Sequence, residues 1–337
     1  MTRVSVLGAS GYIGGEVLRL LGGHPQVTEI VPVSSSRAGD IVGDTVRGVR
    51  NSSVGDLRFV DIDAMPDVDV AIAAMPHGAL PERLDSVSAK ASTVINVAGD
   101  FRLTDPAAAA RHYPASAATP VAGAYYIPEF GEVPDGSLVN MPGCMAVAAL
   151  YAALPLYRGG LVCGPVVIEA KTGSSGGGVH GEAHAQRYGD IRMHRFFGHR
   201  HEPEVREAIS RYSGKDPDIQ FSTVSLPISR GVFVSVYARL RPDTGITEVR
   251  RVYAEAYRHS AFVKVRNGRS PGSFPSVNTV IGTNFAEVGV AVRGESCVAV
   301  CALDNLIKGG GGQAVQAMNK RLGLPEETGL MAAARWP

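Results

Sequence analysis

The stretch VSVLGASGYIGGEV, residues 4–17, constrains the fold of this chain more than any other part of its sequence. An apolar, strand-like run leads directly into glycines at positions 8, 11 and 14, and apolar residues at helical spacing follow. Small residues at such a junction let a phosphate approach the backbone, and the first turn of the helix presents N–H donors to it. The spacing departs from the commoner G-x-G-x-x-G, but its setting favours a dinucleotide site over a turn that only packs helix on strand. We expect the contacts with this cofactor to come from Gly8, Ser10, Gly11, Tyr12, Ile13 and Gly14.

The end of the second predicted strand bears on which dinucleotide binds. An NAD site usually carries an acidic residue there, which holds the ribose 2′-hydroxyl. This chain instead has Ser34, Ser35, Ser36 and Arg37. Hydroxyls and a guanidinium suit a 2′-phosphate, so we predict NADP(H), with an ordinary polar loop as the alternative.

Strand-like and helix-like segments alternate through the first third of the chain. The near-continuous apolar runs at residues 68–76 and 92–100 are typical of buried parallel strands. The alternation predicts an α/β domain of the Rossmann type, with a doubly wound parallel sheet.

Longer strand-like pieces dominate beyond residue 156, and one strong helical pattern covers residues 247–260. They predict a second, α+β domain with a largely antiparallel sheet. A chain of 337 residues is long enough for two domains. The helical pattern of residues 309–324 is expected to pack back on the first domain.

Charge and cysteine usage limit the partners and the compartment. The 33 Lys and Arg residues balance 32 Asp and Glu residues, which gives no sign of a nucleic-acid or membrane partner. The longest apolar run, Met145–Tyr157, is too short to span a bilayer, and no signal peptide is recognisable. The four cysteines form no C-x-x-C pair, so we expect no metal site and a reducing cytoplasm.

One cysteine stands in an unusual setting. Cys144 follows Pro142 and Gly143 and precedes a long alanine-rich apolar run, whereas the other three cysteines lie in apolar, strand-like runs that suit simple packing. The first turn of a helix offers N–H groups and a positive dipole end, which favour the thiolate. Cys144 is therefore the predicted nucleophile.

Eight motifs carry a family resemblance: GASGYIGGE, MPHGAL, GDFRL, YYIPEF, NMPGC, KTGSSGGG, GHRHEPEV and ALDNLIKGGGGQAVQAMN. They occur in the order found in N-acetyl-γ-glutamyl-phosphate reductases, and the resemblance covers nearly the whole chain. The sequence looks still closer to the branch that acts on glutamyl or aminoadipyl phosphates attached to an amino-group carrier protein. These enzymes belong with the aspartate-semialdehyde dehydrogenases. One departure is Met141, where the family usually has Asn.

The resemblance implies an NADPH-dependent acyl-phosphate reductase that makes a semialdehyde in arginine- or lysine-type biosynthesis. Cys144 would displace phosphate to form a thioester, which hydride from NADPH would reduce. The implied layout is an NADP-binding domain at residues 1–143 and 304–337, with a catalytic and dimerisation domain at residues 144–303. A homodimer or homotetramer is implied as well.

The acid–base group is expected in the element GHRHEPEV, where the family's catalytic histidine lies. His201 is preferred and His199 stays open, because alternate residues of an extended chain point opposite ways and only one would face Cys144. His77 is expected to support a loop rather than to act as the base.

Substrate contacts are expected from the loop KTGSSGGG, whose backbone donors could hold the phosphate or an oxyanion; a flexible hairpin tip is the alternative. Arg102 is a candidate carboxylate or phosphate ligand, or else an ion-pair partner of Asp100 or Asp105. Asn305 resembles the residue that bonds the nicotinamide carboxamide, with Gln313 a weaker neighbour. The substrate-binding set is Arg102, Lys171, Ser174, Ser175 and Gly176.

What blocks the substrate amine is the main open choice. Lys171 before GSSGGG, and the basic segment 187–201 with Arg187, Arg192, Arg195 and Arg200, favour an acidic carrier protein as partner. Free N-acetyl-γ-glutamyl phosphate is the alternative substrate, since the basic loop can equally be solvated. Other classes also remain: a non-catalytic NADP-binding regulator, an aspartate-semialdehyde dehydrogenase proper, or an alcohol dehydrogenase that would not need Cys144.

Overall fold

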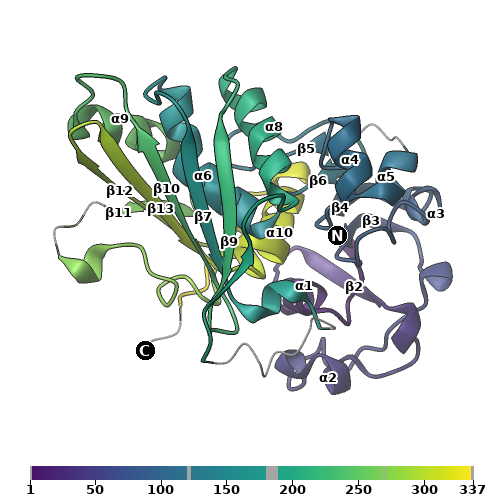
Figure 1. Ribbon diagram of the computed structural model, residues 1–337. Helices are drawn as coiled ribbons and strands as arrows, with labels where there is room; N and C mark the ends of the chain where they lie inside the picture. Colours follow the sequence, from purple (N-terminus) through teal and green to yellow (C-terminus); the bar gives the residue numbers. More distant parts are fainter. Residues whose placement is uncertain (1, 120–122, 180–188, 267, 269, 335–337) are drawn as a thin grey trace. The chain divides into compact units, whose positions relative to one another are not determined.

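The computed structural model describes residues 2–119, 123–179, 189–266, 268 and 270–334 (Figure 1). The chain forms two compact units, Met1–Gly143 with Gly310–Ala332 and Cys144–Gly309 with Ala333–Pro337. It leaves the first unit directly before Cys144 and returns to it at Gly310, whereas the resemblance implies a return at residue 304.

The first unit is built on a six-stranded sheet in the order β2-β1-β3-β4-β6-β5, and all its pairings are parallel. Because β2 and β3 flank β1 on opposite sides, the strand order reverses beside β1, where such folds bind ligands at the carboxyl ends of the strands. The predicted doubly wound parallel sheet is therefore confirmed. Its strands are β1 (Thr2–Leu7), β2 (Val27–Val33), β3 (Val68–Ala73), β4 (Ala91–Asn96), β5 (Ala124–Tyr125) and β6 (Leu138–Asn140).

Helices of the first unit follow its strands, as the alternating pattern predicts. Helix α10 contacts both α1 and β4, so the last helix packs on this unit. The helices are α1 (Tyr12–Gly22), α2 (Val42–Thr45), α3 (Leu84–Ser88), α4 (Pro106–His112), α5 (Pro114–Ala118) and α10 (Gly312–Arg321).

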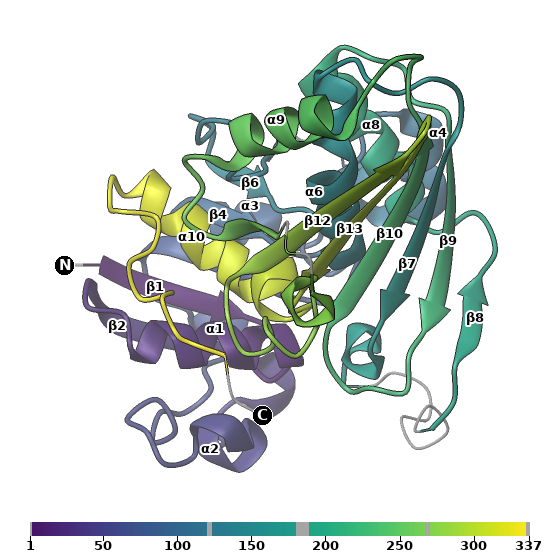
Figure 2. The same ribbon diagram turned by 90° about the vertical axis from the view of Figure 1, so that its left-hand side faces the viewer.

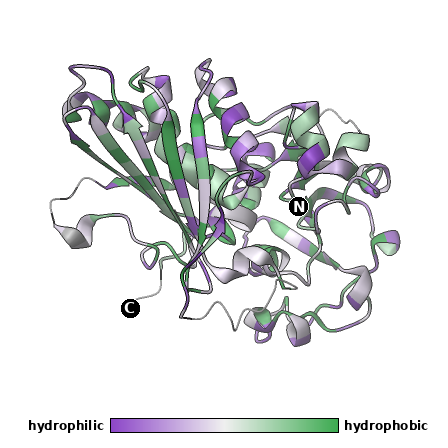
Figure 3. Cartoon of the chain, viewed as in Figure 1, coloured by the Kyte–Doolittle hydropathy of each residue, from purple (hydrophilic) through white to green (hydrophobic). Residues whose placement is uncertain are grey.

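The second unit is built on a seven-stranded sheet in the order β11-β12-β13-β10-β7-β9-β8. Two pairings, β7 with β9 and β11 with β12, are parallel and the others are antiparallel, in agreement with the predicted α+β domain. Polar and apolar residues alternate along several strands (Figure 3), as expected of a sheet with one covered face. The strands are β7 (Val166–Thr172), β8 (Arg192–Arg195), β9 (Ile219–Ser225), β10 (Val232–Arg239), β11 (Val263–Arg266), β12 (Ala286–Arg293) and β13 (Ser296–Leu303).

In the part of the second unit that the structure describes, the sheet is accompanied by α6 (Cys144–Arg158), α8 (His201–Ser213) and α9 (Ile246–Tyr257). Helix α6 lies along one face of the sheet, with α8 and α9 beside it (Figure 2). All of Met145–Tyr157 is buried, so the apolar run noted in the sequence is a core helix. Among the described residues, no helix is both long and apolar enough to cross a membrane.

Two tyrosines of α9 donate to carbonyls of α6 near its internal proline, and one of them replaces the donor that the proline lacks. Pro155 has no N–H, so it cannot donate to the carbonyl of Tyr151 four residues before it. The hydroxyl of Tyr257 donates to that carbonyl at 2.6 Å, and Tyr253 donates to the carbonyl of Ala152. The two hydroxyls thus satisfy buried carbonyls of the helix whose first residue is Cys144.

Candidate active site

The glycine-rich turn of the first unit is shaped by close backbone packing. Gly8 follows β1 with φ +76°, and a Cβ at this position would lie 2.5 Å from the carbonyl oxygen of Ala74. A Cβ at Gly14 would overlap the carbonyl of Gly8, so glycine there lets α1 pack directly on the turn. Within the described chain, no side chain caps α1 and no acidic residue lies in its first turn. An uncapped, acid-free helix start against a close-packed turn fits the pyrophosphate of a dinucleotide.

The polar residues after β2 lie beside this turn in the same unit. The hydroxyls of Ser10 and Ser34 are 2.9 Å apart, so two predicted contacts with the cofactor are brought together. Ser35, Ser36 and Arg37 form a short 3₁₀ turn and are exposed. The guanidinium of Arg37 is half exposed and reaches the Asp40 carboxylate at 3.7 Å. Such a loose surface pair leaves the cation accessible to an anion such as a 2′-phosphate.

Two asparagines that sequence reasoning missed hold the GDFRL segment. Asn96 and Asn140 are the last residues of the paired strands β4 and β6, and Nδ2 of Asn96 donates to Oδ1 of Asn140 at 2.9 Å. The same Nδ2 donates to the carbonyl of Asp100, and Nδ2 of Asn140 donates to that of Phe101. These bonds hold Phe101 at φ +63°, which is rare for a bulky residue and is typical of functional loops.

Arg102 follows this strained residue and is 95% buried, with Nη2 donating to the carbonyl of Val97 at 2.8 Å. Burial raises the pKa of Asp100, although hydrogen bonding with Gly78 N–H and the charge of Arg102 both lower it. Asp105 caps α4 by accepting from the N–H of Ala107. The charge of Arg102 thus acts on Asp100, one of the two acids considered as its partner. His77 accepts from the N–H of Gly99 through Nδ1, a loop-supporting contact.

Cys144 is the first residue of α6 and is half-buried. The predicted position of the nucleophile at a helix start is therefore present in the structure. Gly309 packs directly on it, since a Cβ at Gly309 would lie 2.6 Å from Cβ of Cys144. Met141, where the family usually has Asn, is fully buried in the first unit.

The two histidines of the H-R-H element lie together, contrary to the expectation that they point opposite ways. Their rings are 4.7 Å apart, and both side chains are at least nine-tenths buried. The chain is not extended here, because Arg200 is already in the helical region and His201 begins α8. The backbone N–H of His201 donates to Nδ1 of His199 at 3.1 Å, so this nitrogen is the acceptor in the contact that joins the two residues. His199 also stacks on Phe221.

Cys144 and His201 thus occupy equivalent positions, each as the first residue of a helix, and these helices, α6 and α8, pack against each other. A thiol and an imidazole, each the first residue of one of two packed helices, are the components of nucleophilic catalysis with proton transfer.

Lys171 does not join this group. In β7, Val166, Ile168 and Ala170 are fully buried on the face that α6 covers, so Lys171 points to the opposite face. There it contacts Glu169 and the hydroxyl of Ser235. The alternation of side chains along the strand is the reason for the difference from the predicted set.

The loop after β7 holds its backbone donors in internal bonds. The N–H groups of Ser174 and Ser175 donate to the carbonyls of Ile228 and Ser229, and that of Gly176 to Gly173. These donors are not available to an oxyanion, so the loop can offer side-chain hydroxyls instead. Asn305 donates to the hydroxyl of Ser175 at 3.0 Å and accepts from the N–H of Gly231 at 2.6 Å. The side-chain amide of Asn305, which the sequence predicts to bond the nicotinamide, therefore donates to the loop after β7 that is predicted to contact the substrate.

The basic segment considered for a carrier protein is described only in part, since Arg187 lies outside the described residues. Arg192 and Arg195 are exposed on the edge strand β8. Within the described residues, no three His, Cys, Asp or Glu side chains gather as metal ligands would.

Comparisons with known proteins agree with this fold. Residues 3–135 match the NAD-binding domain of semialdehyde dehydrogenases, and residues 144–305 match their dimerisation domain. Aspartate semialdehyde dehydrogenase II of Vibrio cholerae, solved in complex with ASA, superposes with a TM-score of 0.74 over 96% of this chain and 98% of its own, at 15% identity. The enzyme of Candida albicans with NADP gives 0.70 over 96% and 100%, at 14% identity. These two neighbours show the fold alone.

Fold and site together define a semialdehyde dehydrogenase, an oxidoreductase with a nicotinamide-dinucleotide domain, as the sequence predicts. N-acetyl-gamma-glutamyl-phosphate reductase 1 of Lactiplantibacillus plantarum is 39% identical over 99% of this chain and all of its own length. A reductase of that name from Bacillus mycoides is 33% identical over 99% and 100%. The chain belongs to the N-acetyl-γ-glutamyl-phosphate reductase family. None of these relatives is named for a carrier-protein substrate, so the alternative substrate fits better than the preferred one.

Proposed function

We propose that this chain reduces free N-acetyl-γ-glutamyl phosphate to the semialdehyde with NADPH, in arginine biosynthesis. The observation that carries the proposal is the sequence identity of 39% and 33%, over 99% of this chain, with two reductases of that name. The positions of Cys144 and His201, each the first residue of one of two packed helices, support the chemistry. The choice of NADPH is supported by Ser34 and Arg37 and by the fold relative solved with NADP.

In the proposed reaction, the sulfur of Cys144 attacks the acyl carbon of the acyl phosphate. The bond from that carbon to the phosphate oxygen breaks, phosphate leaves with the electron pair, and a thioester forms on Cys144. NADPH, when bound, supplies the hydride that reduces this thioester. The bond from the carbon to the sulfur then breaks, the semialdehyde leaves, and the thiolate of Cys144 is restored. His201 takes the proton of the Cys144 thiol and gives a proton to the oxygen of the reacting carbonyl. The backbone N–H of His201 donates to Nδ1 of His199, which fixes the start of α8.

The role proposed for Arg102 is to bind the carboxylate or phosphate of the substrate. The buried bond to Val97 and the strained Phe101 fix the direction of its guanidinium. Ser174 and Ser175 are proposed to contribute hydroxyls from the loop after β7, because its backbone donors are engaged.

The uncovered face of the second sheet supports a homodimer or homotetramer. Val167, Tyr237 and Val298 are direct cross-strand neighbours on β7, β10 and β13 and are 36–45% exposed. An apolar row of this kind on a matched dimerisation domain suits a symmetric interface. Tyr237→Arg is expected to lower the mass measured by light scattering, and an unchanged mass would place the interface elsewhere.

The reverse reaction tests the proposed function. The wild-type enzyme should reduce NADP⁺ only when N-acetylglutamate semialdehyde and phosphate are both present. Cys144→Ser should abolish this reaction, whereas Cys163→Ser, at an exposed position, is the matched control and should retain it. Faster turnover of aspartate semialdehyde, or of a carrier-linked semialdehyde, would contradict the proposed substrate.

A further inference from the structure

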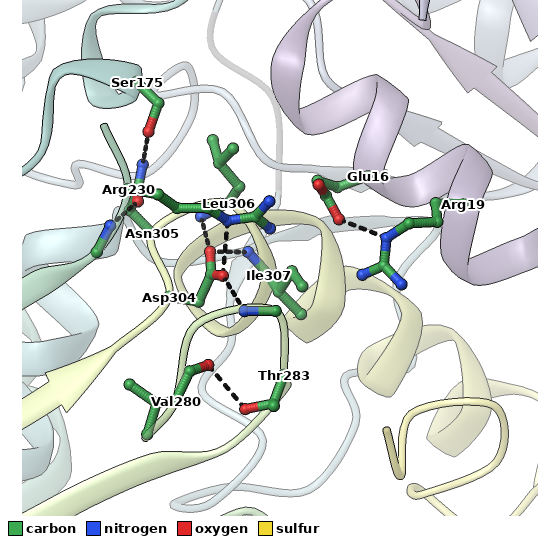
Figure 4. A network of polar contacts seen from close by, with 12 residues as sticks. Glu16, Arg19, Ser175, Arg230, Val280, Thr283, Asp304, Asn305, Leu306 and Ile307 are labelled. Atoms are coloured by element: carbon green, nitrogen blue, oxygen red, sulfur yellow. Dashed lines mark hydrogen bonds and ion pairs between the residues drawn. The ribbon is translucent and has the colours of Figure 1, made fainter. Parts of the chain in front are cut away.

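The carboxylate of Asp304 joins three segments of the second unit (Figure 4). The residue is fully buried at the end of β13. Its Oδ1 accepts from the N–H groups of Leu306 at 2.9 Å and Ile307 at 3.2 Å. Its Oδ2 accepts from Nε of Arg230 and from the N–H of Gly282, both at 2.7 Å. Four donors on one buried carboxylate fix the start of the turn that runs from Asp304 to Gly309.

The end of the same turn rests on the nucleophile. The N–H of Gly309 donates to the carbonyl of Asp304 at 2.8 Å, which closes the turn. Gly309 lies so close to Cys144 that an added Cβ would be 2.6 Å from Cβ and 3.1 Å from Cα of the cysteine. The backbone of Gly309 therefore packs against Cys144 and limits where its side chain can lie. Asp304 holds this backbone in position through the turn.

Asn305, the next residue, bonds the substrate loop through the hydroxyl of Ser175. The turn thus contacts the nucleophile at one end and the substrate loop at the other. Displacement of the turn would change the position of the sulfur relative to both its histidine and its substrate.

We propose that Asp304 is a positioning residue: through the Asp304–Gly309 turn it fixes Cys144 for attack. The proposal rests on the function proposed above, in which Cys144 is the nucleophile. Asp304→Asn keeps the shape of the side chain and two of its acceptor contacts. It places an amide N–H₂ against two donors, Arg230 Nε and Gly282 N–H, so the turn must shift.

The reactivity of Cys144 is the direct readout, measured as the rate of iodoacetamide alkylation against pH in a Cys163→Ser background. Because the N–H groups at the start of α6 favour the thiolate, a displaced sulfur should ionise less readily, so we expect Asp304→Asn to move the midpoint of this pH profile upward. We also expect kcat to fall by about tenfold or more, with KM for NADPH unchanged, because small displacements of a reacting atom have large kinetic effects. Glu287→Gln is the matched control. Glu287 is also a buried, ion-paired carboxylate of this unit, held by Arg266 and Thr279.

A second variant separates positioning from general loss of structure. Gly309→Ala pushes directly on Cβ of Cys144 and should lower kcat in the same way. If both variants act through one contact, the double variant should be little worse than the poorer single one. Multiplicative losses, or an alkylation profile for Asp304→Asn that matches Glu287→Gln, would overturn the proposal. Because alkylation needs no substrate, a wrong substrate assignment would leave this test intact.

Discussion

Alanine at Gly8 should destabilise the protein more than alanine at Gly39 or Gly48, two glycines that serve as controls. Gly8 combines φ +76° with a carbonyl oxygen 2.5 Å from the position of a Cβ. Gly39 has a similar φ of +88°, but no described atom lies within 4 Å of its Cβ position. Gly48 has neither a positive φ nor a described neighbour within that distance. Alanine at these three positions separates backbone strain from overlap.

The expected losses differ in a fixed order. Left-handed backbone costs an alanine about 1–2 kcal/mol, partly offset by the lower entropy of the unfolded chain, so Gly39→Ala should lower the free energy of unfolding by about 1 kcal/mol. Gly8→Ala adds overpacking of about 1–3 kcal/mol, for a total of about 2–4 kcal/mol. Gly48→Ala should be neutral or stabilise by about 0.5 kcal/mol.

Thermal unfolding followed by circular dichroism measures these losses. About 1 kcal/mol corresponds to roughly 3 °C for a unit of this size, so Tm should fall by roughly 10 °C for Gly8→Ala and by roughly 3 °C for Gly39→Ala. Equilibrium titration with NADPH should show weaker binding for Gly8→Ala alone. Equal Tm values for the two variants would refute the close approach of Ala74 as the reason for glycine at this turn.

Three further results are expected. Tyr257→Phe removes the donor to a buried carbonyl of α6 and should lower the free energy of unfolding by about 1–3 kcal/mol in urea titrations. Tyr237→Phe, which keeps the apolar ring of the proposed interface, should cost less than about 0.5 kcal/mol. Burial raises the pKa of Cys297 to about 12 and that of Cys301 still further, so mass spectrometry after iodoacetamide treatment of the native protein at about pH 8 should find neither modified; modification of either would show that its strand opens. Because burial raises the folded pKa of Asp100 above 3.8, its contribution to stability is full below that value and is lost as the pH rises through the folded pKa. Asp100→Asn should therefore reduce the fall in urea midpoint as the pH rises above about 4, and an unchanged fall would assign the pH dependence to other groups.

Much of the fold follows from local sequence. Glycine at position 8 is required by a positive φ beside a neighbouring strand, and such steric limits act over a few residues. The apolar runs of β3 and β4 are buried by neighbouring strands and helices whatever the details of packing. Cys144 at the start of α6 is likewise predictable, because the preceding proline and glycine and the following apolar run define where the helix begins.

The orientations and hydrogen-bond partners of the candidate site residues could not be predicted from local sequence, because they depend on residues far away in the chain. The sequence predicts that His199 and His201 point apart, but the helix that begins at His201 turns both rings to one side. The loop after β7 has many potential donors in sequence, yet its N–H groups bond to the strand connection at residues 228–229. Asn96 and Asn140 are 44 positions apart and meet only because β4 and β6 pair in register.

The sequence alone determined the glycine-rich turn, the position of Cys144 at a helix start and the two kinds of sheet, since each depends on sterics and hydrophobic patterning within a short segment. Tertiary structure decided which polar groups remain available for chemistry. Lys171 is directed to the far face of its sheet, Asn305 is bonded to Ser175, and Asp304 gathers donors from three segments. The physical reason is that a hydrogen bond depends on the position of both partners, and only the folded chain fixes the second one.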